Sequence, residues 1–116
     1  MLPKKRRIGR SLFAYITRVG KRYNSPHFLM YTAPMKAEEK PQDSRFSFSL
    51  SKKNCKSAVL RNKLRRRGYS VIKDIIINIE SGHYFFFNSK KGVEKVGFLE
   101  LKGEIVKLLS NYTVLK

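Results

Sequence analysis

The segment from residue 58 to about residue 77 constrains the fold most, because its residues repeat with the period of a long amphipathic helix. At about 100° per residue, one flank of this helix gathers apolar side chains and a glycine: Leu60, Leu64, Gly68, Val71 and Ile75. The other flank carries Arg61, Asn62, Arg65, Arg66 and Tyr69. We therefore expect a helix that packs one side against a core and offers its guanidinium groups to a polyanion.

The start and the middle of this helix carry further signals. Ser57 stands directly before the segment and is a good N-cap residue. Gly68 lies inside it and costs about 1 kcal/mol relative to Ala in a helix interior. A glycine at this position indicates either a close packing contact or a bend.

The charge of the chain indicates a polyanionic partner. Its 116 residues include 26 Lys and Arg against 8 Asp and Glu, which gives a formal charge of +18. Such repulsion weakens a folded state unless a polyanion neutralises it. Nucleic acid is the favoured partner and an anionic membrane surface is the alternative; no apolar run approaches the roughly 20 residues that span a bilayer. With 41% hydrophobic residues, the chain is expected to form a single RNA-binding domain over residues 1–116 rather than a disordered tail.

Shorter patterns predict the other elements of an α+β fold. Two further helices and three strands are expected, at Ser11–Val19, Phe98–Leu109, His27–Ala33, Arg45–Ser51 and Tyr84–Phe87. The Arg45–Ser51 segment alternates apolar and polar residues, as a half-buried strand does, whereas Tyr84–Phe87 is continuously apolar, as a central strand covered on both sides would be. The order α-β-β-α-β-α predicts a single-domain α-β sandwich on a small sheet, with the second sheet region open to division into two strands.

Two polar segments and the cysteine content complete this description. Residues 1–10 include four consecutive basic residues and are expected to form a flexible arm that orders on RNA. Residues 35–44 contain Pro41 and three acidic residues and are expected to form a mobile loop. The single cysteine, Cys55, excludes an internal disulfide and is typical of a reducing cytosol. A cytoplasmic protein is therefore expected.

Several motifs resemble the protein subunit of bacterial ribonuclease P over nearly the whole chain. They are Leu2-Pro-Lys-Lys5, Phe13, Gly20, Ser25-Pro26, Phe46-Ser-Phe-Ser-Leu-Ser-Lys-Lys53, Ala58-Val-Leu-Arg-Asn-Lys-Leu-Arg-Arg66 and Gly82–Phe87. The block around Arg61-Asn62 is the most diagnostic of them. The resemblance implies an αβββαβα-type fold with a small mixed sheet and a left-handed crossover helix, although the general rule for a parallel strand pair favours the right-handed form.

The resemblance also implies a function. A member of this family is the protein component of an endoribonuclease: it binds the catalytic RNA and the single-stranded 5′ leader of precursor tRNA. It assists the metal-dependent removal of that leader, which gives mature tRNA 5′ ends. The RNA would carry the chemistry and hold most of the Mg²⁺, so no catalytic residue is expected in this chain. No membrane contact and no obligate protein partner are expected either. The acidic residues agree, because Asp74, Glu80, Glu94, Glu100 and Glu104 are scattered along the chain, whereas a two-metal nuclease needs clustered acids.

Residues of the basic helix and of the loop before it are expected to bind the catalytic RNA. They are Lys52, Lys53, Lys56, Arg61, Asn62, Arg65 and Arg66. A guanidinium group can bind a phosphate bidentately, which an ammonium group cannot. Asn62 is neutral among cations and can orient a hydrated metal ion through water, although no direct metal ligand is expected. The plainer interpretation is a solvated basic face.

A second set of residues is expected, by the resemblance, to bind the leader. Phe13 and Tyr31 would line a cleft between the first helix and the sheet, and Arg45 and Ser49 would contact leader phosphates. Stacking on an aromatic ring contributes about 1–3 kcal/mol per base and tolerates any sequence. For Phe13 and Tyr31 the alternative is core packing.

Two other functions fit the same composition. A ribosomal or RNA-chaperone-type binding protein without an enzyme role needs the same basic face. A protein-only nuclease is the second alternative, but nothing in the sequence pairs Cys55 with His27 or His83 as a nucleophile and its base.

Overall fold

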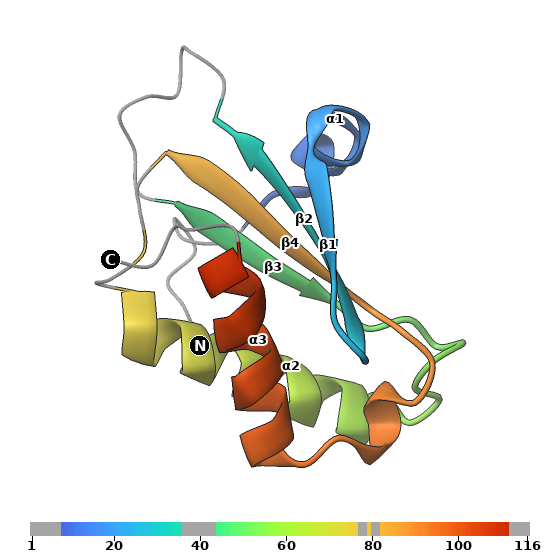
Figure 1. Cartoon of the computed structure of the whole chain (residues 1–116). Helices are drawn as coiled ribbons and strands as arrows, with labels where there is room; N and C mark the ends of the chain where they lie inside the picture. The colour runs from blue at the N-terminus through green and yellow to red at the C-terminus, as the bar shows by residue number, and fades with distance from the viewer. Residues whose placement is uncertain (1–7, 36–43, 77–78, 80–81, 112–116) are drawn as a thin grey trace.

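The computed structural model describes residues 8–35, 44–76, 79 and 82–111. Within these ranges, three α-helices lie on a four-stranded sheet (Figure 1). The elements are a 3-10 turn at Arg10–Leu12, α1 at Phe13–Val19, β1 at Lys21–Asn24, β2 at Phe28–Pro34, β3 at Arg45–Ser49, α2 at Ala58–Ile75, β4 at His83–Ser89, a 3-10 turn at Val93–Lys95 and α3 at Phe98–Asn111. The α+β class and the αβββαβα order are confirmed.

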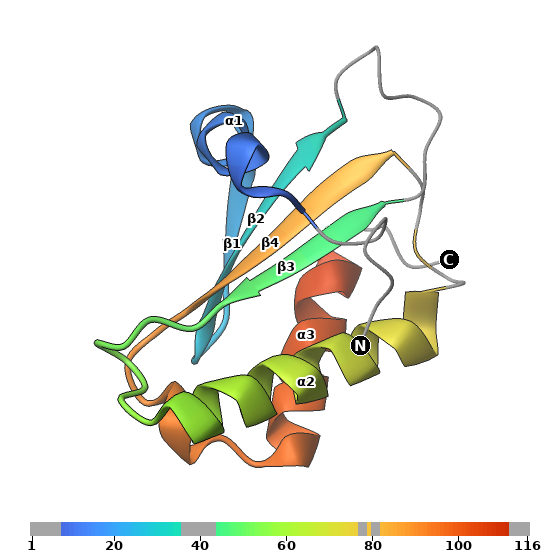
Figure 2. The ribbon, with the colours of Figure 1, turned by 180° about the vertical axis from the view of Figure 1, so that it is seen from behind.

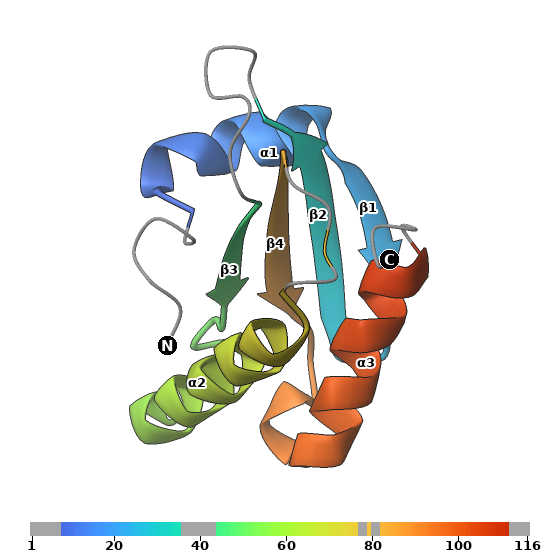
Figure 3. The ribbon, with the colours of Figure 1, turned by 90° about the vertical axis from the view of Figure 1, so that its left-hand side faces the viewer.

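The sheet is mixed and contains one crossover. Its strand order is β1-β2-β4-β3. β2 pairs antiparallel with both β1 and β4, whereas β3 pairs parallel with β4. The chain passes from β3 to β4 through α2. In Figure 3, β3 and β4 both point downward, β4 lies to the right of β3, and α2 lies on the viewer's side, so the crossover is left-handed.

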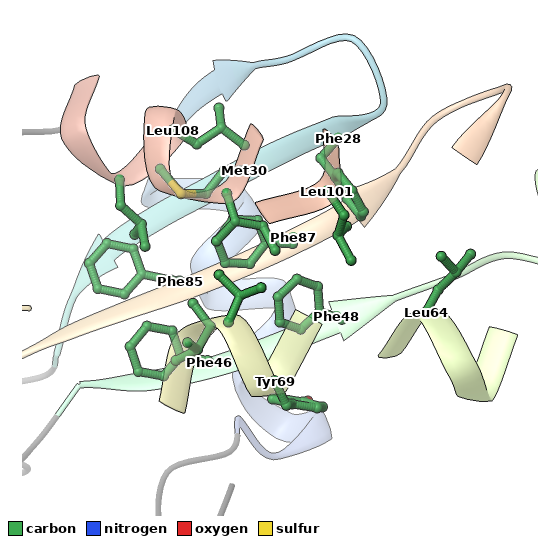
Figure 4. Close-up of a cluster of buried hydrophobic side chains, with 14 of the residues drawn as sticks. Phe28, Met30, Phe46, Phe48, Leu64, Tyr69, Phe85, Phe87, Leu101 and Leu108 are labelled. Atoms are coloured by element: carbon green, nitrogen blue, oxygen red, sulfur yellow. The ribbon is translucent and has the colours of Figure 1, made fainter. Parts of the chain in front are cut away.

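One face of the sheet is sealed by α2 and α3. Six side chains from three strands form the centre of this core, each at most 4% exposed: Phe28, Met30, Phe46, Phe48, Phe85 and Phe87. The helices contribute Leu64, Leu101 and Leu108 to the same cluster (Figure 4). Phe48 and Phe87 stack with ring centres 4.7 Å apart. The main core of the molecule therefore lies between the sheet and these two helices.

Helix α2 begins as predicted and lies unusually close to β3. The Ser57 side chain accepts a hydrogen bond from Leu60 N at 3.2 Å, so it caps the helix. A Cβ atom at Gly68 would lie 2.8 Å from the Phe48 ring. Of the two interpretations of this glycine, close packing is therefore the correct one.

Tyr69 corrects the prediction that it shares the basic flank of α2. Its side chain is only 4% exposed, and its ring meets Phe48 edge-on at 5.1 Å between centres (Figure 4). Because Gly68 lets the helix approach the sheet, the residue beside it is covered as well. The basic surface therefore includes Arg66 but excludes Tyr69.

The strand β1 was absent from the order of elements predicted from residue patterns alone. Its sequence Lys-Arg-Tyr-Asn carries no apolar alternation, and three of its four residues are exposed. It is an edge strand whose backbone pairs with β2, and its half-buried Tyr23 packs against the main core. On the opposite edge, Ile8 is buried and its N–H donates to the Phe46 carbonyl at 3.1 Å. Residues 1–7 and 36–43 of the predicted arm and loop lie outside the described residues.

Candidate nucleic-acid interface

The basic flank of α2 is open to solvent and forms a shallow pocket. The pocket is lined by Val59, Asn62, Arg65 and Arg66. Asn62 and Arg66 are exposed and Arg65 is half-buried. Arg65 Nη1 donates to Asn62 Oδ1 at 2.9 Å, which fixes one edge of the guanidinium group. This arrangement can receive a phosphate group against Arg65 and Arg66.

Other residues of α2 have different roles. Arg61 Nη1 donates to the carbonyls of Cys55 and Lys56, each at 2.9 Å, so this guanidinium group is turned toward the preceding loop. The Arg67 guanidinium carbon lies 5.9 Å from the ring centre of Phe98 on α3. The pocket is thus built by Arg65 and Arg66, and Arg61 flanks it.

The loop between β3 and α2 displays the three lysines that were predicted to extend the basic surface. Lys52, Lys53 and Lys56 are all exposed. Between them, Asn54 Nδ2 donates to the Ser89 carbonyl at 3.0 Å. This loop leads directly from the end of β3 into α2 (Figure 2). We group its lysines and the arginine pocket together as the basic surface.

The opposite face of the sheet carries a row of aromatic side chains. Phe86 on β4 lies at its centre, opposite Tyr31 on β2 and Ser47 on β3. Phe13 of α1 stacks on Phe86 with ring centres 4.8 Å apart and planes 15° apart. Tyr31 also stacks on Phe86, at 6.0 Å. Phe13 and Tyr31 are half-buried, so they both pack against the second cluster of the core and present ring surface at its edge.

The next row of this face contains two polar residues and one leucine. Ser49, Asn88 and Leu29 lie side by side by strand register, and all three are half-buried. Arg45, also half-buried, lies on the same face at the other end of β3. Ser49 is three residues before Lys52, so the aromatic face and the basic surface meet where β3 ends.

Sequence reasoning missed two residues of this face, Phe86 and Asn88. Phe86 was part of a continuously apolar run, in which alternate residues of β4 cannot be assigned to a face without the register. That register places Phe86 beside Tyr31 and Asn88 beside Ser49. If the pairing of β4 with β2 and β3 were known, the alternation of side chains between the two faces of a strand would assign Phe86 and Asn88 to this face.

The histidine nearest to the sheet edge is engaged in a structural cluster. His27 Nδ1 lies 2.6 Å from Glu104 Oε2 on α3. Glu104 Oε1 accepts from Ser25 Oγ at 2.6 Å and from His27 N at 2.8 Å. Burial would raise the pKa of Glu104, but the hydrogen bonds from Ser25 and His27 outweigh it, so the pKa is lowered from its ordinary value. This cluster ties the turn between β1 and β2 to α3.

Among the residues that the structure describes, no three His, Cys, Asp or Glu side chains lie together as a metal site would require. The only amide of the arginine pocket, that of Asn62, already accepts a hydrogen bond from the cationic Arg65, which is an unfavourable neighbour for a metal ion. Within the same residues, none of the helices has the length and apolar content to cross a bilayer.

Known proteins resemble this chain in sequence and in fold. The family profile described as Ribonuclease P matches residues 2–113. A ribonuclease P protein component from Microcystis aeruginosa is 30% identical over 97 residues, covering 84% of this chain and 81% of the relative. One from a Synechococcus strain is 28% identical over 116 residues, covering 99% of this chain and 87% of the relative.

Solved structures agree with this assignment at the level of the fold. The RNase P protein of Staphylococcus aureus superposes with a TM-score of 0.84 at 22% identity, over 98% of this chain and 100% of that protein. The RNase P protein of Thermotoga maritima gives 0.79 at 21% identity, over 90% and 96%. With a family profile that spans nearly the entire sequence, the chain belongs to the ribonuclease P family, as a protein component of bacterial tRNA processing.

Proposed function

We propose that this protein binds the catalytic RNA of ribonuclease P through the basic surface of α2 and the loop before it. The observation that carries this proposal is the pocket of Val59, Asn62, Arg65 and Arg66, which is cationic, concave and open to solvent. The half-buried Arg65, the exposed Arg66 and the exposed lysines of the preceding loop offer several cationic groups, as an extended polyanion requires. Neutralising these phosphates releases counterions and favours the bound state.

We further propose that the aromatic face of the sheet holds the single-stranded 5′ leader of precursor tRNA. Phe13 and Tyr31 present ring edges and faces on which unstacked bases can lie. Ser49 and Arg45 lie at the two ends of β3 on the same face, and in this proposal they contact the leader backbone. The leader and the catalytic RNA would then approach from the two surfaces that meet at the end of β3.

In this proposal the protein supplies binding and the RNA supplies the chemistry. The described residues of this chain offer no cluster of metal ligands, and Asn62 is engaged with Arg65. In this proposal the Mg²⁺ is held mainly by RNA phosphates. The contribution of the protein is to neutralise phosphates so that substrate and catalytic RNA approach closely, and to retain the leader.

Reconstitution with the cognate catalytic RNA tests this function. At low Mg²⁺, addition of the protein is expected to restore cleavage of a leader-bearing precursor, because its arginines replace part of the cation atmosphere. No restoration would favour a ribosomal or RNA-chaperone-type role. Cleavage that persists after exhaustive removal of RNA from the protein would instead support a protein-only nuclease.

A further inference from the structure

The first half of the loop between β3 and α2, residues 50–57, is fastened to the end of β4. Ser51 N donates to Ser89 Oγ at 3.2 Å, and Asn54 Nδ2 donates to the Ser89 carbonyl at 3.0 Å. Inside the loop, Cys55 N donates to the Ser51 carbonyl at 2.9 Å. The two bonds to Ser89 hold the first half of the loop against the end of β4.

The second half of the loop is fastened to α2 by one residue. Arg61 Nη1 donates to the Cys55 carbonyl and to the Lys56 carbonyl, at 2.9 Å in both cases. Hydrogen bonds from a charged donor are stronger than neutral ones. Arg61 lies about one turn into α2, so its hydrogen bonds hold the second half of the loop against the start of this helix.

The two sets of bonds enclose one buried side chain. Cys55 is 0% exposed, whereas the neighbouring Lys52, Lys53 and Lys56 are exposed. The loop therefore has a buried side and a cationic side, and the bonds keep the cationic side outward. A backbone that is fixed before binding loses less conformational entropy when its lysines meet a ligand.

We propose that Arg61 is a positioning residue that latches this loop closed, so that Lys52, Lys53 and Lys56 meet RNA phosphates from a fixed backbone. The latch is a property of the free protein, and its consequence for RNA binding rests on the proposed function. Arg61 affects binding through the loop even where its own remaining N–H groups contact no phosphate.

Cys55 provides a direct measure of the latch, because it is the only cysteine in the chain and its thiol is reached only when the loop opens. The rate at which Ellman's reagent labels the thiol of the free protein reports the open population. Arg61→Gln is expected to raise this rate about tenfold or more, since two charge-assisted hydrogen bonds are lost. Arg66→Gln removes the same charge from an exposed position of the same helix and is expected to label at the wild-type rate. If Arg61→Gln also labels at the wild-type rate, the latch does not exist.

Global unfolding would expose the same thiol, so the labelling is repeated in low concentrations of urea. Opening of the loop alone exposes little surface, and its rate is expected to change little with urea. A steep dependence on urea in Arg61→Gln would show that the substitution acts on overall stability, which overturns the proposal.

The consequence for RNA binding is tested without changing any charge. The double variant Ser89→Ala with Asn54→Ala removes the two side-chain hydrogen bonds that join the loop to the end of β4. It therefore weakens the latch on the side of the sheet. If only the closed loop binds, the Kd for the catalytic RNA is multiplied by one plus the opening constant measured by labelling, and the salt dependence is unchanged. A Kd that rises by this factor supports the positioning role of Arg61, and a Kd that does not follow the opening constant contradicts it.

These outcomes separate the latch from the proposed function. Unchanged labelling in Arg61→Gln removes the latch and leaves RNA binding by Arg65 and Arg66 intact. Normal RNA affinity after loss of Arg65 removes the proposed function and leaves the labelling result intact.

Discussion

The two faces of the sheet carry similar aromatic side chains but are not covered to the same extent. On the face beneath α2 and α3, Phe46, Phe85 and Phe87 are 0% exposed. On the face beneath α1, Tyr84 and Phe86 are buried as well, but Phe13 and Tyr31 are half-buried, and so is the neighbouring row that contains Ser49 and Asn88. Aromatic content alone therefore does not distinguish a core from a binding surface; the helices that cover each face do.

The number and position of the covering helices explain the difference. Among the described residues, α2 and α3 lie on one face of the sheet, whereas the 7-residue α1 lies alone on the other face and crosses the strands at one end (Figure 3). The other end of that face is therefore left uncovered by a helix. Tyr31 lies at the border of the covered part, and Leu29, Ser49 and Asn88 lie beyond it.

The largest expected effect contrasts the two faces in stability. Phe87→Ala on the sealed face is expected to lower the free energy of unfolding by about 3–5 kcal/mol, because it leaves a cavity among rings that cannot collapse. Tyr31→Ala on the open face is expected to cost much less, since its ring is already partly hydrated. Urea denaturation of both variants measures this. Equal losses would erase the distinction between the faces.

Glu104 tests the attachment of the edge strand that borders the open face. Glu104→Gln is expected to cost about 2–3 kcal/mol, because the charged acceptor of Ser25 and His27 is lost. The pKa of Glu104 is lowered in the folded state. Its stabilising effect is therefore complete above its ordinary value of 4.5 and is lost as the pH falls through the lower folded-state pKa.

The measurement is thermal or urea unfolding of wild type and Glu104→Gln between neutral and strongly acidic pH. The difference between the two proteins is expected to shrink on acidification below about pH 4.5. His27 and Lys90 lie in the same cluster, so the comparison between the two proteins, rather than the wild-type curve alone, isolates Glu104. A difference that is constant with pH would contradict the role of the carboxylate.

The open face is expected to bind substrate, and Tyr31→Ala tests this. Loss of one stacking platform is expected to weaken binding of leader-bearing precursor tRNA to the holoenzyme by about 1–3 kcal/mol. Mature tRNA lacks the leader and serves as the internal control, with unchanged affinity. Equal losses for both RNAs would mean that the substitution damages the fold instead.

A smaller change in stability tests the close contact between α2 and β3 on the sealed face. Gly68→Ala is expected to destabilise the protein by about 1–2 kcal/mol, because the added Cβ meets the Phe48 ring, although Ala favours the helix. Gly103→Ala on α3 is the matched control, since nothing lies within 4 Å of the added atom. That control is expected to stabilise the protein by up to about 1 kcal/mol. If both substitutions stabilise equally, the contact between α2 and β3 is looser than described.

Much of the fold could be predicted from the sequence because burial imposes periodicity. The long helix and its Ser57 cap, the strands around Phe48 and Phe87, and the inward face of α3 all follow from that periodicity. β1 could not be predicted, because three of its four residues are exposed and a single partly buried residue leaves no apolar alternation. Tyr69 was assigned to the wrong side, since the contact made possible by Gly68 widens the buried face of α2.

The residue types of the candidate site could be predicted from the sequence, but the hydrogen bonds and strand neighbours of these residues could not. Arg65 and Arg66 were expected on an exposed flank, and they are found there. The bonds of Arg61 to two loop carbonyls depend on the path of the loop, which no periodicity encodes. Phe86 became part of the aromatic face only through the strand register. How these surfaces bind RNA stays a prediction.

The salt dependence of catalytic-RNA binding tests the central claim most directly. Arg65→Ala is expected to weaken binding and to flatten the slope of log K against log salt by about one ion, because one phosphate contact is lost. Lys107→Ala, at an exposed position of α3, is the matched control and is expected to leave the slope unchanged. A slope for Arg65→Ala identical to that of the wild type would contradict the assignment of α2 as the RNA-binding surface.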